Sequence, residues 1–305
     1  MRLDVPAAMA RNATDAWGAD GARWLAALPD LVAAVARDWD LAVGDPFPLS
    51  YHWVCAVTRA DGTPAVLKLG PPEPGHLAVE AATLEFLGGR GAVRLLAHDP
   101  ARGALLLERA PGPPVSALGP DRDAEATDAV IAAIRGLRRP APAGGPWPEL
   151  AAHEAESFAG HLRGVPDHPD LPHSLVRRAA AVFDELCASA PGSVLLHGDL
   201  HHDNVLAAER EPWLVIDPFG VIGDPGYEVG SMLYNPDPPR RDERWLALVE
   251  DRIERLADGL SMPVERVVAW GFVKAVLTDV WTAQDGGIRP SRGLDVATRL
   301  LPRLP

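Results

Sequence analysis

The sequence predicts an α+β protein of two lobes: a small antiparallel β-sheet with one helix, followed by a larger, mainly helical lobe. Short strand-like runs dominate the first third of the 305 residues, and long amphipathic patterns dominate the rest. A connector rich in Pro and Gly, APGPPVSALGP at residues 110–120, separates the two patterns. We therefore assign residues 1–109 to the first lobe, 110–120 to a linker and 121–305 to the second lobe, and we expect the lobes to share a cleft.

The first lobe contains a strong hairpin signal, because Asp61-Gly62 separates two runs rich in β-branched and aromatic residues. The helices follow from apolar residues that recur at helical spacing. The expected elements are a helix at 21–39, strands at 53–59 and 64–70, a helix at 75–87, and strands at 92–98 and 104–109.

The second lobe is mainly helical by the same criterion. Its expected helices lie at 122–137, 153–162, 174–190, 242–260 and 264–284, and a further helix begins within 223–235. Three short apolar runs in its middle predict strands at 194–196, 204–207 and 213–216. The turns between these strands are dense in His, Asp and Asn, which indicates a functional site.

Composition limits the classes of partner. The net charge of −13 argues against nucleic acid, which selects for clustered Lys and Arg, and it suits a small cationic substrate as well as simple solubility. No apolar run approaches the roughly 20 residues of a membrane span, and the N-terminus lacks the apolar core of a signal peptide. Two cysteines far apart in the sequence favour free thiols over a disulfide. We expect a cytoplasmic monomer or weak dimer without a nucleic-acid or membrane partner.

The strongest motif is HGDLHHDN at 197–204, followed by VIDPFG at 215–220. Phosphoryl transfer from ATP to a hydroxyl requires a carboxylate that accepts the proton and Mg²⁺ held by hard oxygen ligands. Asp199 and Asn204 have the five-residue offset of the base and the metal-binding Asn in protein kinases, and Asp217 follows the next strand as a second metal ligand. The alternative is a polar turn in which these side chains only satisfy backbone groups.

Lysine usage points to a phosphate-binding residue. Only Lys68 and Lys274 are lysines among 29 basic residues, and the other 27 are arginines. Lys68 ends AVLK, a strand of the V-A-I-K type whose ammonium reaches the phosphates and pairs with a carboxylate on the next helix. Glu80 is preferred over Glu85 for that pairing, and a Lys68 side chain that extends along the strand to solvent is the alternative.

The rest of the nucleotide site carries weaker signals. The loop at 47–54 has no Gly-rich motif, although Ser50 and backbone amides could cap the β-phosphate. Backbone groups of Glu108 and Ala110, at the end of the last strand of the first lobe, could bind adenine.

A rival interpretation treats His197, Asp199, His201, His202 and Asp203 as ligands of two metals in a phosphohydrolase. That interpretation leaves Lys68 and Asn204 without a role. We expect His197 instead to pack beneath the loop and to hydrogen-bond the backbone that holds Asp199.

The acceptor pocket is the least determined part of the site. Carboxylates would suit a cationic acceptor, and an aromatic residue and an Asp end the last long helix. The candidates are His202, Asp224, Glu228, Trp281 and Asp285. A helix cap for Asp224, a core position for Trp281 and an ordinary helix-end position for Asp285 are the alternatives.

The chain resembles the aminoglycoside phosphotransferase superfamily, and within it the streptomycin 6-phosphotransferase and hydroxyurea phosphotransferase group. The resemblance is carried by DGTPAVLK at 61–68, GRGAVRLL at 89–96, HGDLHHDN at 197–204 and WLVIDPFGVIGDPGYE at 213–228.

The resemblance implies a protein-kinase-like bilobal fold with ATP and Mg²⁺ as cofactors. It implies that Lys68 and Glu80 act on the phosphates, Asp199 as base, and Asn204 and Asp217 as metal ligands. The predicted function is ATP-dependent phosphorylation, and so inactivation, of a streptomycin-type aminoglycoside. The alternatives are the same chemistry on hydroxyurea or another small-molecule alcohol, a nucleotide-binding pseudokinase, and a metal phosphohydrolase.

Overall fold

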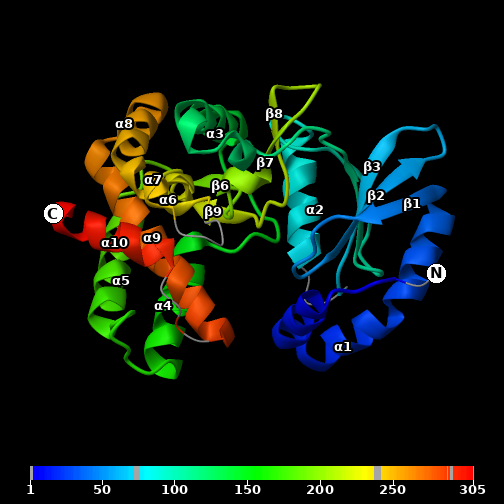
Figure 1. Cartoon of the computed structure of the whole chain (residues 1–305), viewed down its shortest axis with the longest axis horizontal. Coiled ribbons are helices and arrows are strands. Elements are labelled where there is room, and N and C mark those ends of the chain that lie inside the picture. Colours follow the sequence, from blue (N-terminus) through cyan, green and yellow to red (C-terminus); the bar gives the residue numbers. More distant parts are fainter. Residues whose placement is uncertain (1–2, 72–75, 237–241, 287, 289–290, 305) are drawn as a thin grey trace. The chain divides into compact units, whose positions relative to one another are not determined.

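The computed structural model describes residues 3–71, 76–236, 242–286, 288 and 291–304, without the side chains of 285 and 286. The chain divides into two compact units, unit 1 at Met1–Ala110 and unit 2 at Pro111–Pro305 (Figure 1). None of the helices in these described ranges has the length and apolar character needed to cross a membrane.

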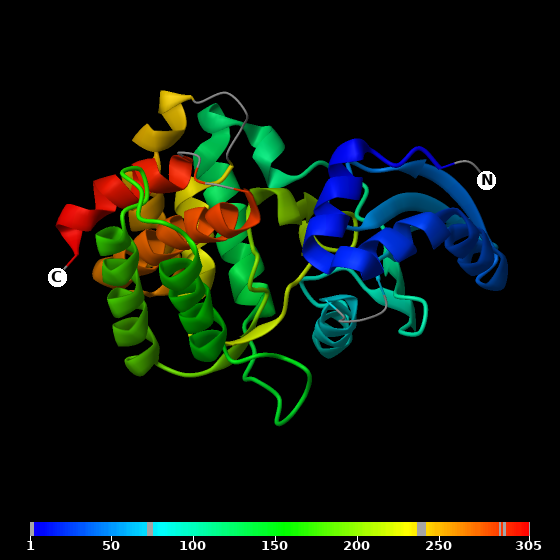
Figure 2. The same ribbon diagram turned by 90° about the horizontal axis from the view of Figure 1, so that it is seen from below.

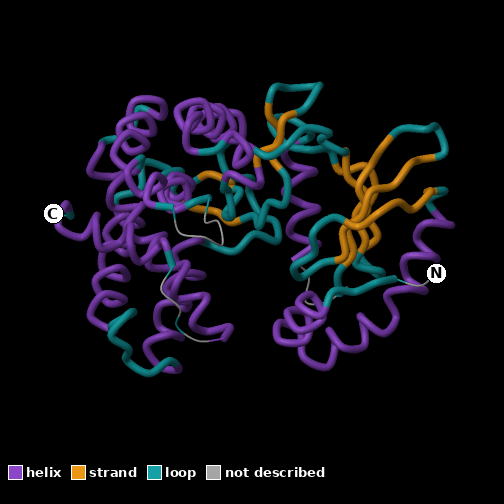
Figure 3. Tube along the Cα trace, in the orientation of Figure 1, coloured by secondary structure: helices purple, strands orange, loops and turns teal. Residues whose placement is uncertain are grey.

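Unit 1 is built on a five-stranded antiparallel sheet with the strand order β1-β2-β3-β5-β4. Its strands are drawn in orange in Figure 3. The strands are β1 Leu41–Pro46, β2 Trp53–Arg59, β3 Pro64–Leu69, β4 Leu95–Asp99 and β5 Ala104–Glu108. The β2–β3 hairpin forms at the predicted turn, where the Asp61 carboxylate accepts a hydrogen bond of 3.0 Å from the Thr63 amide. The sequence did not predict β1, whose Gly44 and Pro46 are typical of an edge strand.

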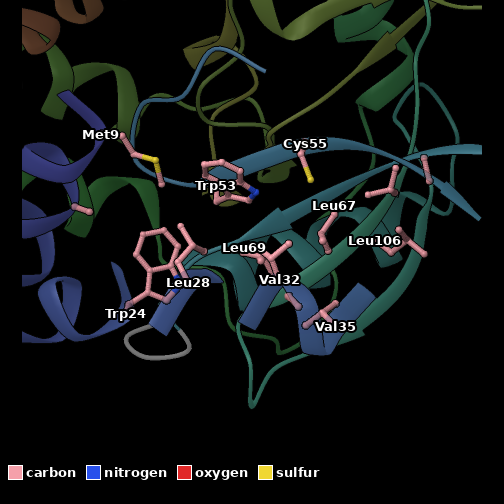
Figure 4. Packing of buried hydrophobic residues seen from close by; sticks show 14 residues of the cluster. Met9, Trp24, Leu28, Val32, Val35, Trp53, Cys55, Leu67, Leu69 and Leu106 are labelled. Atoms are coloured by element: carbon pink, nitrogen blue, oxygen red, sulfur yellow. The ribbon is translucent and has the colours of Figure 1, made fainter. Parts of the chain in front are cut away.

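Helix α1, Ala7–Asp38, covers one face of this sheet (Figures 1 and 2). It is longer than the predicted helix at 21–39 and bends at Gly18, whose φ of 55° favours glycine. Its buried side chains pack against β2, β3 and β5 to form the core of unit 1 (Figure 4). The Leu67 and Leu69 side chains belong to that core, so Lys68 between them points to the opposite face of the sheet. Helix α2, His76–Leu87, provides the partner of Lys68 on that face.

Unit 2 is organised around α9, Val264–Gly286, which is buried along most of its length and packs against α4, α5, α6, α8 and α10 (Figures 1 and 2). Its other helices are α3 Asp123–Leu137, α4 Leu150–Gly164, α5 His173–Ala188, α6 Tyr227–Tyr234, α7 Glu243–Ala247, α8 Val249–Leu260 and α10 Arg292–Leu300. The predicted single helix at 242–260 is wrong in one respect, because the helical hydrogen bonding breaks at Leu248 and gives α7 and α8.

Two small antiparallel pairs lie among these helices. They are formed by β6 Val194–Leu196 with β9 Val221–Gly223, and by β7 Val205–Ala207 with β8 Trp213–Val215. The connections between these four strands carry the polar residues that the sequence singles out.

Candidate active site

The β7–β8 register brings the two predicted metal ligands to the same end of one hairpin. Val205 pairs with Val215, and the amide of Ile216 donates a hydrogen bond of 3.0 Å to the carbonyl of Asn204. Asn204 therefore ends the 197–204 loop beside the strand that leads into Asp217. The sequence brings Asn204 and Asp217 together only if the apolar runs at 204–207 and 213–216 form a hairpin. In the structure these runs form the β7–β8 hairpin.

His197 makes hydrogen bonds to both polar segments of the site, 197–204 and 215–220. Its Nε2 donates to the carbonyl of Ile216 at 2.8 Å, and its Nδ1 accepts from the amide of Asp199 at 3.3 Å. Its own carbonyl accepts from the amide of Gly220 at 3.0 Å. Burial lowers the pKa of His197 to about 4, so the imidazole is neutral, with its proton on Nε2.

These contacts agree with the expected packing of His197 beneath the loop. They also weaken the phosphohydrolase interpretation, because both ring nitrogens are already engaged and neither can bind a metal.

Asp199 presents its carboxylate to solvent, with the side chain 61% exposed. Its backbone is fixed by the side chain of Asn204, whose Nδ2 donates to the Asp199 carbonyl at 2.9 Å. That bond uses the amide nitrogen of the buried Asn204 and leaves its Oδ1 as the group able to bind a cation. An exposed carboxylate on a fixed backbone has the form required of a general base.

Asp217 is exposed and has a φ of 58°, a left-handed conformation that is uncommon outside glycine. Such strained conformations gather at functional sites. Within the described residues, no group of three or more His, Cys, Asp or Glu side chains forms a metal site. The oxygens of Asn204 and Asp217 nevertheless fit Mg²⁺, which commonly takes one or two protein ligands and completes its shell with phosphate and water.

Three of the predicted acceptor residues are buried: His202 at 1%, Asp224 at 3% and Glu228 at 5% exposure. The Asp224 carboxylate pairs with Arg266 and accepts from the amide of Gly226 at 2.7 Å. Burial, together with the nearby positive charge of Arg252, lowers the pKa of His202 well below its usual value. The acceptor roles of these three residues remain predictions.

Glu228 instead supports the site from beneath. Its Oε1 accepts from the amides of His197 at 2.5 Å and Gly198 at 3.2 Å. The sequence gives no sign of this contact between residues about 30 positions apart, because only the packing of α6 under the loop creates it.

The two remaining acceptor candidates lie at the end of α9. Trp281 is half-buried, and its Nε1 donates to the hydroxyl of Ser157 at 3.4 Å. The Asp285 side chain is outside the described residues, and its acceptor role remains a prediction.

In unit 1, Lys68 Nζ lies 2.6 Å from Glu80 Oε2, and both side chains are at most 5% exposed. Of the two glutamates that the sequence offers, Glu80 therefore holds the ammonium. Removing either partner of a buried pair of this kind would leave an uncompensated charge and destabilise the protein.

The other predicted nucleotide residues of unit 1 engage their neighbours through the backbone or a side chain. The carbonyl of Ser50 accepts from Asn12 Nδ2 at 3.2 Å, and Glu108 Oε2 accepts from the amide of Arg94 at 2.9 Å. Ala110 follows β5 as the last residue of unit 1. The nucleotide roles of Ser50, Glu108 and Ala110 remain predictions.

The fold is that of the small-molecule kinases with a protein-kinase-like architecture. A thermostable mutant of an aminoglycoside phosphotransferase, solved with ADP and hygromycin B, superimposes with a TM-score of 0.61 over 89% of this chain and 95% of its own, at 17% identity. The predicted fold class is confirmed.

Sequence comparison identifies the family of kinases to which the chain belongs. The profile of the aminoglycoside/hydroxyurea antibiotic resistance kinases matches residues 46–286, and the chain belongs to this family. A hydroxyurea phosphotransferase of Kitasatospora aureofaciens is 37% identical over 99% of this chain and 87% of its own length. A streptomycin 6-kinase of Streptomyces griseus is 34% identical over 95% of each chain.

Proposed function

We propose that this chain transfers the γ-phosphoryl group of ATP to a hydroxyl of a streptomycin-type aminoglycoside and so inactivates the drug. The observation that carries the proposal is the arrangement of the 197–204 loop. Asp199 is exposed there on a backbone held by Asn204 and His197, and Asp217 follows at the same end of the β7–β8 hairpin. The family to which the chain belongs supports the same chemistry.

Each side chain has a defined role in the proposed reaction. The acceptor oxygen forms a bond to the γ-phosphorus, the bond from that phosphorus to the β,γ-bridging oxygen breaks, and ADP leaves with the bonding electrons. Asp199 accepts the hydroxyl proton, and the ammonium of Lys68, held by Glu80, binds the α- and β-phosphates. Asn204 and Asp217 would hold Mg²⁺, which neutralises charge on the triphosphate when bound.

Two arguments favour a streptomycin-type acceptor. The S. griseus relative is a streptomycin 6-kinase and matches nearly the whole chain. The net charge of −13 gives the protein an acidic field that raises the local concentration of a cationic acceptor. We also propose the cytoplasm, where ATP is available, as the place of reaction.

Hydroxyurea is the second candidate acceptor, and it is favoured by one observation. The hydroxyurea phosphotransferase of K. aureofaciens has the higher identity of the two relatives, at 37%. The proposed phosphoryl-transfer residues serve either acceptor equally, because none of them recognises the acceptor scaffold.

Label transfer from ATP distinguishes the candidates. The purified chain is incubated with Mg²⁺ and γ-labelled ATP, separately with streptomycin, hygromycin B and hydroxyurea, and labelled products are separated and counted. Label on streptomycin is the expected result. Label on hydroxyurea alone would keep the reaction and replace the acceptor, whereas the absence of any labelled product would contradict the proposed acceptor class.

A further inference from the structure

Lys274 is a buried lysine that the proposed reaction leaves without a role. It lies in α9, it is 1% exposed, and it is one of two lysines in a chain with 27 arginines. An ammonium buried this deeply needs compensating partners, because it loses its hydration shell. The identity of those partners indicates what the residue does.

The partners of Lys274 surround its ammonium on several sides. Nζ donates to the carbonyl of Gly198 at 3.5 Å and lies 4.1 Å from the ring centroid of Tyr227 and 4.8 Å from that of Trp281. The buried Glu154, which accepts a hydrogen bond of 2.7 Å from the Tyr227 hydroxyl, adds a compensating negative charge. The ammonium is thus directed at the backbone of the 197–204 loop by two aromatic faces and a carboxylate.

The backbone that Lys274 contacts is also held from its other side. Glu228 Oε1 accepts from the amides of His197 and Gly198, while Lys274 donates to the Gly198 carbonyl. Gly198 has a φ of 85° and directly precedes Asp199. A flexible glycine before the proposed base is therefore fixed on both its N–H and its C=O, by side chains from α6 and α9.

The fold also leaves space for the Lys274 stem. A Cβ on Gly230, inside α6, would lie 2.6 Å from the Cβ of Lys274 and 2.6 Å from the carbonyl oxygen of Trp270. No side chain fits at that distance, so α6 approaches α9 closely only because residue 230 is glycine. Glycine is otherwise unfavourable in a helix interior, which indicates that this approach is specified.

We propose that Lys274 is a positioning residue of the phosphoryl transfer: its ammonium fixes the carbonyl of Gly198 and thereby the backbone that presents Asp199. This inference rests on the proposed function for its kinetic consequence, and on the contacts of Gly198 for its structural one. The positive charge of the Lys274 ammonium also interacts electrostatically with the carboxylate of Asp199.

The test replaces Lys274 with a neutral side chain of similar length. Lys274→Met should lower kcat by about 100-fold, the loss typical of a misplaced reacting group, and leave the KM for ATP nearly unchanged. In the same variant, amide hydrogen exchange over residues 197–200 should become faster, since the Gly198 carbonyl loses its donor. Both quantities are compared at equal concentrations of folded protein.

Arg292→Met is the matched control. Arg292 is also buried, at 4% exposure, and donates to a backbone carbonyl, that of Pro236 at 3.1 Å, which lies outside the 197–204 loop. This variant should keep the kcat of the folded enzyme and the exchange of residues 197–200. If Lys274→Met does not fold, Lys274→Met with Glu154→Gln removes one charge of each sign, and the same two changes are expected in it.

Unchanged exchange over residues 197–200 in folded Lys274→Met would overturn the proposal, and so would an unchanged kcat. Exchange needs no acceptor, so this measurement stays decisive even if the wild-type chain phosphorylates none of the acceptors tested and the proposed function fails. A kcat that falls equally in Lys274→Met and Arg292→Met would indicate general damage and would also overturn it.

Discussion

The imidazole of His197 is the residue on which both polar loops of the site depend. Its two ring nitrogens and its carbonyl contact Ile216, Asp199 and Gly220, so the loop with the proposed base and the loop with Asp217 share one support. The arrangement requires a neutral ring, because Nδ1 must accept while Nε2 donates. Protonation of His197 would remove the Nδ1 acceptor and with it the hydrogen bond from the amide of Asp199.

Acid should therefore destabilise the protein through His197. The pKa of this ring is about 4 in the folded chain against an ordinary 6.5, so between these values the unfolded chain binds a proton that the folded chain does not. Its contribution to stability is present above pH 6.5 and is lost as the pH falls toward 4. We predict that the free energy of unfolding drops less between pH 7 and pH 5 in His197→Gln, measured by chemical denaturation, than in the wild type.

Glu228 has the opposite effect on the pH dependence of stability. The contribution of His197 is therefore isolated by comparing His197→Gln with the wild type. Burial raises its pKa to about 7 from 4.5, so its contribution to stability grows as the pH falls through that window. His153→Gln, at an exposed position, is the control and should reproduce the wild-type drop. A drop in His197→Gln as large as that of the wild type would contradict the assignment to His197.

At this scale the sequence is informative where roles follow from spacing. The five-residue offset of Asp199 and Asn204 and the position of Asp217 after a strand are local properties of the sequence. The structure places Asn204 and Asp217 at one end of the β7–β8 hairpin. The contacts of Glu228 and Lys274 with Gly198 are not local, since they arise from helices packed beneath the loop. The sequence identified Lys274 only as a rare lysine.

Helix α1 supplies much of the core of unit 1. Trp24, Leu28, Val32 and Val35 recur at helical spacing, are at most 5% exposed, and face the sheet (Figure 4). Burial of this helix face against the sheet therefore contributes to the stability of unit 1.

We predict that Leu28→Ala lowers the free energy of unfolding of unit 1 by about 2–5 kcal/mol, because it leaves a cavity at a position that is 0% exposed. Leu96→Ala in the same unit, at a side chain that is 40% exposed, should change it by only about 0.5 kcal/mol. Denaturant unfolding of the full chain measures both. Equal effects of the two substitutions would contradict the packing described for α1.

Elements with a strong periodic or turn signal were predictable, and others were not. The β2–β3 hairpin follows from Asp61-Gly62 and forms nearly at the predicted bounds. The first half of α1 was missed because its buried positions include small residues such as Ala13, which leave a weak apolar pattern. Helix α10 was missed because it is short and alternates charged with apolar residues.

At the scale of the whole molecule, each unit supplies a different part of the proposed chemistry. Unit 1 contributes the buried pair of Lys68 and Glu80, and unit 2 contributes Asp199, Asn204 and Asp217. The family profile covers residues of both units, from 46 to 286.

Both cysteines are free, and burial raises the pKa of the Cys55 and Cys187 thiols to about 11, so neither offers a thiolate for an alternative chemistry.

The role of Asp199 as general base is tested by the rate of phosphoryl transfer in Asp199→Asn, with ATP and acceptor saturating. We predict a loss of about 10²–10⁴-fold in this rate with ATP affinity retained, because the substitution removes the base and keeps the shape of the side chain. Asp203→Asn, an exposed carboxylate of the same loop that pairs with Ser116, should keep the wild-type rate. A wild-type rate in Asp199→Asn would show that Asp199 is not the base of the transfer.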